Sequence, residues 1–184
     1  ANAVAGEKRF FHWFLEFPEV FVNGGFNCIL GNPPYLGDRK ISGNYGNDYL
    51  QWLRSAFAPI KSVDLVTYFF RRIFSCLCDN GFQSLISTNT IGQGKSREGG
   101  LAVIQKQGGA INYAIRSMRW PGLAAVEVAQ VAVFKGKWSK EFILDNKKVE
   151  RITSYLDDSE ELGDPYKLYQ DKDKSFQGSI VLGK

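Results

Sequence analysis

The stretch that decides the fold of this chain reads Gly25-Phe26-Asn27-Cys28-Ile29-Leu30-Gly31-Asn32-Pro33-Pro34-Tyr35. Its apolar part, residues 26–31, predicts a short buried strand. The two prolines that follow fix φ at successive positions and remove two backbone donors. A rigid polar turn at the carboxyl end of a strand is where open α/β folds place their chemistry. We therefore expect residues 32–35 to present carbonyl oxygens, one amide and one aromatic ring to a flat group that carries an NH2.

The bulk properties indicate one globular domain. A chain of 184 residues can bury a real core but is short for two domains. The formal charge of +4 permits a polyanionic partner without arguing for one. Cys28, Cys76 and Cys78 form no CxxC pair, which predicts buried thiols in a reducing compartment and no disulfide framework. The only histidine, His12, lacks acidic neighbours, so no metal site is expected, and no apolar stretch reaches the ~20 residues that span a bilayer.

Strand and helix patterns alternate along the chain. Apolar residues at three- and four-residue spacing predict an amphipathic helix that begins after an N-cap at Asp64 and stops at Asn80-Gly81. The aromatic segment 10–22 is apolar enough to belong to the core, and residues 147–156 fit a strand or a helix equally well. The alternation favours a mostly parallel sheet with helical cover. The other predicted segments are helices at 48–57 and 101–106, strands at 82–88, 110–116 and 126–134, and loops at 36–47 and 89–100.

The predicted turn suits chemistry on an exocyclic amine. The amine of adenine is a poor nucleophile because its lone pair is delocalised into the ring. The side-chain carbonyl of Asn32 and the backbone carbonyl of Pro33 can each accept one N–H, which favours a tetrahedral nitrogen with a free lone pair. This is preorganised electrostatic help for the transition state. Tyr35 can stack on the ring of a base that has been extruded from a duplex. A glutamine side-chain amide is also a flat NH2, so this chemistry alone does not separate the two substrates.

Several motifs together resemble N6-adenine DNA methyltransferases of bacterial restriction-modification systems, of the type IIG kind. Residues 25–35 look like motif IV, with its Asn-Pro-Pro-Tyr core, and the aromatic segment 11–21 is similar to the lead-in of the large enzymes. Trp120-Pro121-Gly122, followed by the strand pattern 126–134, resembles motif VIII. The family usually has a Phe where this chain has Trp120. Residues 175–183 resemble the join to a target-recognition region, so the resemblance covers most of the chain.

The resemblance implies a partial Rossmann-like, S-adenosylmethionine-dependent methyltransferase fold of the α/β class. Residues 1–156 would form the C-terminal half of the catalytic domain, and residues 157–184 a linker toward a recognition domain. It implies direct methyl transfer to a flipped adenine in double-stranded DNA, in the bacterial cytoplasm. Asn32, Pro33 and Tyr35 would be catalytic, with Pro34 and Trp120 against the base. The Gly-containing cofactor loop of the family is not found before Asn32, so the exposed half-sheet is expected to favour self-association.

Other patterns leave alternatives open. Arg39, Lys40, Lys95 and Arg97 are candidate contacts to DNA phosphate, although a solvated loop explains each equally well. Gly94-Lys95-Ser96 resembles the end of a nucleotide-binding P-loop, but Asn89 stands where its first glycine belongs. The aromatic lead-in and the exit at 175–183 favour DNA over a protein glutamine as the substrate. A module that kept the fold and lost activity is the third alternative.

Overall fold

The computed structural model describes residues 11–60, 62–120 and 126–160. Six strands in this part of the chain form one sheet in the order β1-β2-β4-β3-β5-β6. The strands are β1 (Phe26–Gly31), β2 (Leu77–Thr88), β3 (Gly109–Arg119), β4 (Glu127–Lys135), β5 (Phe142–Leu144) and β6 (Lys147–Val149). The helices are α2 (Trp13–Glu16), α3 (Pro18–Val22), α4 (Asp38–Tyr45), α5 (Asn47–Ala56), α6 (Leu65–Cys76), the 3₁₀ helix η1 (Asn89–Gly92), α7 (Gly94–Gly99) and α8 (Leu101–Lys106).

The sheet is mixed, which corrects the prediction of mostly parallel pairing. Strands β1 and β2 are parallel, as are β3 and β5, but the other three neighbouring pairs are antiparallel. The cause is β4, which follows β3 after a short connection and inserts antiparallel between β2 and β3. Because β4 opposes both neighbours, β1, β2 and β3 run in the same direction. Their carboxyl ends therefore meet at one edge of the sheet.

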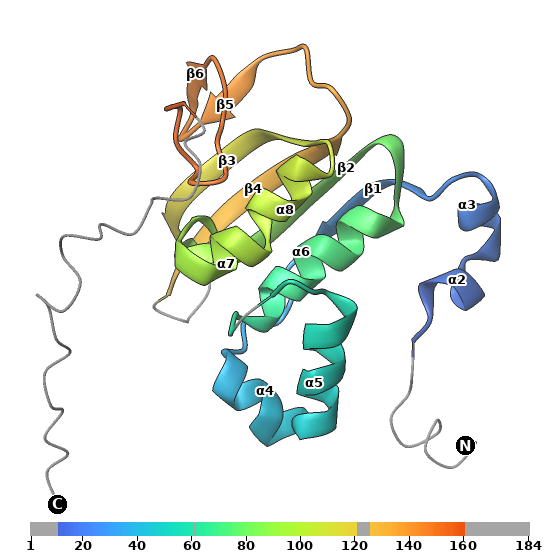
Figure 1. Ribbon diagram of the computed structural model, residues 1–184. Helices are drawn as coiled ribbons and strands as arrows, with labels where there is room; N and C mark the ends of the chain where they lie inside the picture. The colour runs from blue at the N-terminus through green and yellow to red at the C-terminus, as the bar shows by residue number, and fades with distance from the viewer. Residues whose placement is uncertain (1–10, 61, 121–125, 161–184) are drawn as a thin grey trace, which may run out of the picture.

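The main core lies between the sheet and the helices α6, α7 and α8, which cover one face (Figure 1). The predicted stripe of α6 is confirmed, since Val66, Phe70 and Ile73 are buried against the sheet. Its predicted end is wrong, because the helix stops at Cys76 and β2 begins at Leu77. Gly81 instead permits close strand contact: a Cβ there would lie 2.8 Å from the carbonyl oxygen of Phe26.

A second, smaller cluster joins α4, α5 and α6. It contains the buried side chains of Ile41, Leu50, Leu53, Val63, Leu65 and Tyr68. The segment 36–47 was expected to be a loop, but most of it forms α4, which packs beside α5. This cluster follows directly after the Asn-Pro-Pro-Tyr turn in sequence and shares Phe69 with the main core. The turn therefore enters a packed helical unit.

Strand β1 is not buried, contrary to the prediction. All of its residues are exposed or half-buried, because β1 lies at the edge of the sheet with one neighbour. The aromatic segment before it is also only partly covered: rings of Trp13, Phe17 and Phe21 pack around Phe26, while Leu15 is 76% exposed. The thiols were expected to be buried as well, but Cys28 is exposed, Cys78 is half-buried and Cys76 alone is buried.

The remaining segment predictions have mixed outcomes. The structure confirms a helix at α8, a helix at α5 and strands at β2, β3 and β4, although β2 and β3 are longer than expected. The predicted loop 89–100 contains η1 and α7, and the ambiguous segment 147–156 begins with β6. Pro121 and Gly122 of the motif VIII resemblance, and residues 161–184 of the predicted linker, lie outside the described residues. No helix in the described part of the chain is long and apolar enough to cross a membrane.

Candidate functional site at the carboxyl edge of the sheet

The Asn-Pro-Pro-Tyr turn leaves β1 at the carboxyl edge of the sheet and has no regular secondary structure until α4. Asn32 and Pro34 are exposed, Pro33 is buried and Tyr35 is half-buried with its ring packed against the main core. The Tyr35 hydroxyl donates a hydrogen bond to Oδ1 of Asn32. Burial raises the pKa of Tyr35, so the hydroxyl keeps its proton at neutral pH and remains a donor. Tyr35 thereby orients the Asn32 amide, whose oxygen can accept a second hydrogen bond.

The exit of the turn is fixed by α6. The carbonyl oxygen of Leu36 accepts a hydrogen bond from the backbone N–H of Leu65 at 2.8 Å. The Leu36 side chain also packs against the smaller cluster. The turn is thus held by strand pairing at one end and by the first residue of α6 at the other. The sequence gives no local signal for this contact, because the two residues lie far apart along the chain.

Trp120 lies at the same edge as Asn32. It follows the last residue of β3, and its backbone N–H donates to the carbonyl oxygen of Val126 at 3.0 Å. The start of β4 pairs with the end of β2 through Val128 and Thr88. Strands β1 and β3 are three strand spacings apart across the sheet, because β2 and β4 lie between them. The register also places Gly31 level with Ala114, six residues before Trp120, so Trp120 is further along the sheet than Asn32.

Three of the four predicted phosphate contacts are exposed. Arg39 and Lys40 lie in the first turn of α4, directly after the Asn-Pro-Pro-Tyr turn, and Lys95 lies in α7. Arg97 is different: it is 4% exposed, its Nη1 donates to the hydroxyl of Ser154 at 3.0 Å, and its guanidinium lies over the ring of Tyr155. This geometry gives Arg97 a packing role that joins α7 to residues 154–155. It also corrects the expectation of a solvated loop at this position.

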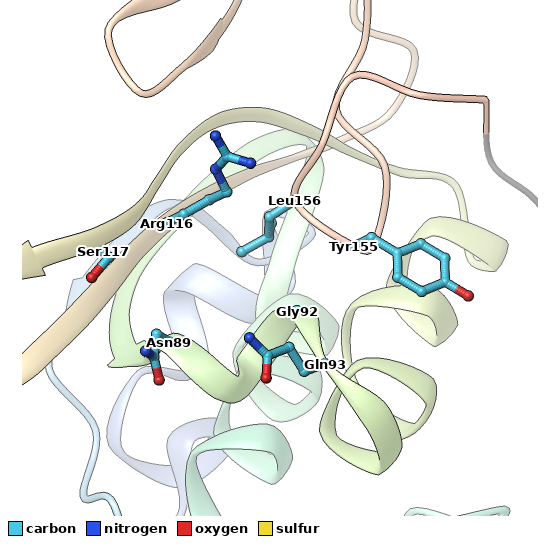
Figure 2. Close-up of a pocket in the computed structure, with 7 residues that line it drawn as sticks. All are labelled: Asn89, Gly92, Gln93, Arg116, Ser117, Tyr155 and Leu156. Carbon is cyan, nitrogen blue, oxygen red and sulfur yellow. The ribbon is translucent and has the colours of Figure 1, made fainter.

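A separate cavity of about 180 Å³ opens where β2 and β3 end (Figure 2). Its lining residues are Asn89, Gly92, Gln93, Arg116, Ser117, Tyr155 and Leu156. Two of its lining side chains already have partners. Nε of Arg116 lies 2.6 Å from Oδ2 of Asp145, and the hydroxyl of Ser117 donates a hydrogen bond to Glu127. None of the residues predicted from the sequence lines this cavity, so it is distinct from the turn. No group of three or more metal-binding side chains occurs within residues 11–60, 62–120 and 126–160.

Comparison with known proteins places the chain in a family. Residues 1–105 match the Eco57I restriction-modification methylase family. The chain is 29% identical over 162 residues to DNA methyltransferase A of Bacillus subtilis (strain 168), a match that covers 80% of this chain and 18% of that protein.

Among solved structures, the type IIL restriction-modification enzyme MmeI in complex with DNA superposes with a TM-score of 0.62 and 28% identity. That match covers 73% of this chain and 20% of MmeI, so the chain spans about a fifth of the length of these two relatives. The family match includes β1 and the whole turn that follows it, and it extends over more than half of the sequence. The chain belongs to the Eco57I restriction-modification methylase family.

Proposed function

We propose that this chain is the amine-binding part of a DNA methyltransferase that methylates N6 of adenine in a bacterial restriction-modification system. The observation that carries the proposal is the exposed carbonyl oxygen of Asn32, held by the Tyr35 hydroxyl in a turn beyond β1. The restriction-modification family supplies DNA as the substrate class. The DNA bound to MmeI in its solved complex is consistent with the same partner here.

The turn would act by accepting the two hydrogens of the N6 amine. Oδ1 of Asn32 accepts one of them while keeping its hydrogen bond from Tyr35, because an amide oxygen has two lone pairs. The backbone carbonyl of Pro33 accepts the other. Two fixed acceptors pull the nitrogen toward tetrahedral geometry and free its lone pair for attack on a methyl carbon. Because the acceptors are held before the substrate arrives, little reorganisation is needed during the reaction.

Aromatic side chains would hold the base outside the duplex. Tyr35 is half-buried with its ring fixed against the core, so one ring surface can lie along the plane of the adenine. Pro34 is exposed beside it, and Trp120 stands at the same edge of the sheet. Stacking of this kind lowers the cost of extruding a base from double-stranded DNA. The exposed cations Arg39, Lys40 and Lys95 would position the DNA backbone without reading its sequence.

S-adenosylmethionine would supply an electrophilic methyl group to this site. In the family resemblance, a Gly-containing loop after a strand that precedes the motif IV strand holds this cofactor, and β1 has one free edge among the described residues. We therefore place donor binding on protein that pairs with the free edge of β1, and we assign no donor-binding residue in this chain.

The proposal is tested with Asn32→Ala in the full-length protein. Purified enzyme is incubated with unmethylated genomic DNA and S-adenosylmethionine, and N6-methyladenine is counted by mass spectrometry of the digested DNA. We expect a loss of about 10²- to 10³-fold in rate, as for removal of one preorganised polar group from an active site. Asn27→Ala is the matched control, since Asn27 is also an exposed asparagine but lies within β1 rather than in the turn. Full activity in Asn32→Ala would remove this residue from the mechanism.

Two other outcomes would redirect the proposal. Methyl transfer to glutamine in a protein substrate, with none to DNA, would indicate the glutamine methyltransferase alternative. DNA binding without any transfer by the wild-type full-length protein would indicate an inactive binding module. Both assays use the same enzyme preparation. Circular dichroism of that preparation shows whether the protein is folded, so either result can be told apart from a failure of folding.

The 184-residue chain alone is expected not to bind S-adenosylmethionine tightly. The physical reason is that the proposal places donor binding on protein that pairs with the open side of β1. Isothermal titration calorimetry with the chain and with the full-length protein measures the difference. Binding by the chain alone with micromolar affinity would contradict this prediction and would require a donor site among residues of this sequence.

A further inference from the structure

A buried polar group stands where the catalytic turn enters α4. Asp38 is the first residue of α4 and lies three residues after Tyr35. One oxygen of its carboxylate, Oδ2, accepts a hydrogen bond from Nη2 of Arg54 at 2.7 Å, across from α5. The side chain of Asp38 is only 15% exposed, whereas that of Arg54 is 42% exposed. The carboxylate is therefore drawn into the protein rather than toward solvent.

The second oxygen of Asp38 has no partner in the described structure. Oδ1 of Asp38 is buried without a hydrogen bond, and the buried hydroxyl of Tyr68 on α6 has no acceptor for its proton. The two groups share a neighbour, Arg54, which is hydrogen-bonded to Asp38. Burial and then the Asp38 carboxylate raise the pKa of Tyr68, while the charge of Arg54 and a hydrogen bond from its side chain lower it. One is a hydrogen-bond donor and the other an acceptor. Buried polar groups left unpaired destabilise a protein, so native structures almost always pair them.

The location of these groups gives them a consequence for the turn. Tyr68 is 2% exposed and its ring packs against Phe57, so its hydroxyl is a fixed point. Leu36 is already tied to Leu65, which lies one turn earlier on α6. A bond from Tyr68 to Asp38 would add a second tie between α6 and the exit of the turn. Strand β1 holds only the start of the turn, through its pairing with β2.

We propose that Asp38 is a positioning residue, held by Arg54 on one oxygen and by the Tyr68 hydroxyl on the other, directly or through one water. This tie, which we call the Asp38 anchor, fixes the exit of the turn and hence the direction of the Asn32 carbonyl. The inference rests on the proposed function of that carbonyl. Neither Asp38 nor Tyr68 contacts the substrate in this scheme.

The sharpest test removes a single oxygen atom. Tyr68→Phe keeps the ring and its packing but deletes the hydroxyl, and Asp38→Asn keeps the shape but deletes the charge. In the full-length protein we expect kcat for DNA methylation to fall about tenfold in each, since a misplacement near 1 Å costs up to about 10²-fold. KM for DNA should change less than twofold. Asp145→Asn is the matched control, because it breaks a comparable ion pair at the other side of the sheet.

A double variant distinguishes an anchor from two unrelated losses. If the two groups act through one tie, Asp38→Asn with Tyr68→Phe should be no slower than either single variant. Multiplied losses, near a hundredfold, would overturn the shared tie. A purely structural role would lower the melting temperature and leave kcat per folded molecule unchanged, which would also overturn the proposal. Wild-type kcat in Tyr68→Phe would remove the hydroxyl from it.

Hydrogen exchange tests the anchor without any activity. The backbone N–H of Leu65 is protected by Leu36, so loosening the exit of the turn should speed its exchange at least severalfold in Tyr68→Phe and Asp38→Asn. The control Asp145→Asn should exchange as the wild type does. Unchanged exchange in both variants would overturn the anchor. Faster exchange in a protein that methylates no DNA would uphold the anchor while rejecting the proposed function, so the two failures are distinguishable.

Discussion

The two edges of the sheet are built in opposite ways. Strand β6, at one edge, has three residues, of which two are lysines, and its neighbourhood carries the ion pairs Lys148–Glu141 and Arg116–Asp145. Strand β1, at the other edge, has six residues and no charge. Leu30 of β1 is 72% exposed, and the helices beside it also expose large apolar side chains. Short, charged edge strands resist pairing with further strands, and long apolar ones invite it.

The difference suits β6 to be the last strand of the sheet and suits β1 to pair with a further strand. The β6 edge is short and charged, as in strands that pair on one side only, while the β1 edge is long and apolar, as in strands that pair on both sides. The Asn-Pro-Pro-Tyr turn leaves from the β1 edge. Pairing of β1 with β2 holds the start of the turn, and α6 holds its exit through Leu65 and the proposed Asp38 anchor.

The largest expected effect compares two leucines on neighbouring strands. Leu85 of β2 is 0% exposed and belongs to the main core, whereas Leu30 of β1 is 72% exposed. Leu85→Ala in the 184-residue chain should lower the free energy of unfolding by about 2–5 kcal/mol, through lost burial and a cavity. Leu30→Ala should change it by no more than about 0.5 kcal/mol.

Urea unfolding followed by circular dichroism measures both values. The same pair in the full-length protein sharpens the comparison, because Leu30→Ala should become costly there if a further element covers β1. Equal, small effects of Leu30→Ala in both proteins would show that the β1 edge stays open and would break the contrast between the two edges.

Much of the interior was predictable because its signals are local. The three- and four-residue spacing of Val66, Phe70 and Ile73 located α6, and the strong β pattern of residues 126–134 located β4. The failures share a physical cause. Apolar β1 was expected to be buried, since a sequence shows that residues can be covered but not whether their cover lies in the same stretch of chain.

Glycine and asparagine at 80–81 were misread for a related reason. Asn80 adopts a positive φ of 62°, as expected for a turn, but the turn lies inside β2 rather than at a helix end. The same pattern serves both structures, and the choice depends on β1, which approaches the backbone at Gly81 closely. That choice is made by tertiary contact, which local spacing does not encode.

The candidate site was predictable in part for the same reasons. Asn32, Pro33 and Tyr35 lie within four consecutive residues, so their rigid turn could be inferred from the prolines alone. The hydrogen bond within the turn was not inferred, although its spacing of three residues would allow it. The contacts from Leu65, Arg54 and Tyr68 join segments that are distant in sequence, and no local sequence pattern predicts them.

A second, intermediate effect concerns association of the chain with itself. The exposed apolar edge of β1 should make the 184-residue chain self-associate at high concentration. Leu30→Lys places a charge on that edge and should shift the sedimentation profile toward monomer, at little cost in stability because the side chain is already exposed. Ser139→Lys, which adds the same charge at an exposed position between β4 and β5, controls for a general effect of net charge. A wild-type chain that stays monomeric at several hundred micromolar would contradict this prediction.

The smallest expected effect on stability concerns Asp145, near the β6 edge. Burial would raise the pKa of Asp145, but hydrogen bonds from the backbone and side chain of Arg116 outweigh it, so the pKa is lowered. A lowered pKa stabilises the folded state at pH values above the ordinary value near 4, and this contribution disappears as the pH falls through the lowered pKa. Because Arg116 is more than half exposed, Asp145→Asn should cost under about 1 kcal/mol at pH 7. Unfolding measured from pH 7 to pH 3 should show the wild type and the variant converging at the acid end, whereas exposed Asp158→Asn should differ little from wild type throughout. If the difference in free energy of unfolding between wild type and Asp145→Asn persists or widens in acid, packing rather than charge stabilises this edge. The contrast with β1 would then rest on strand length alone.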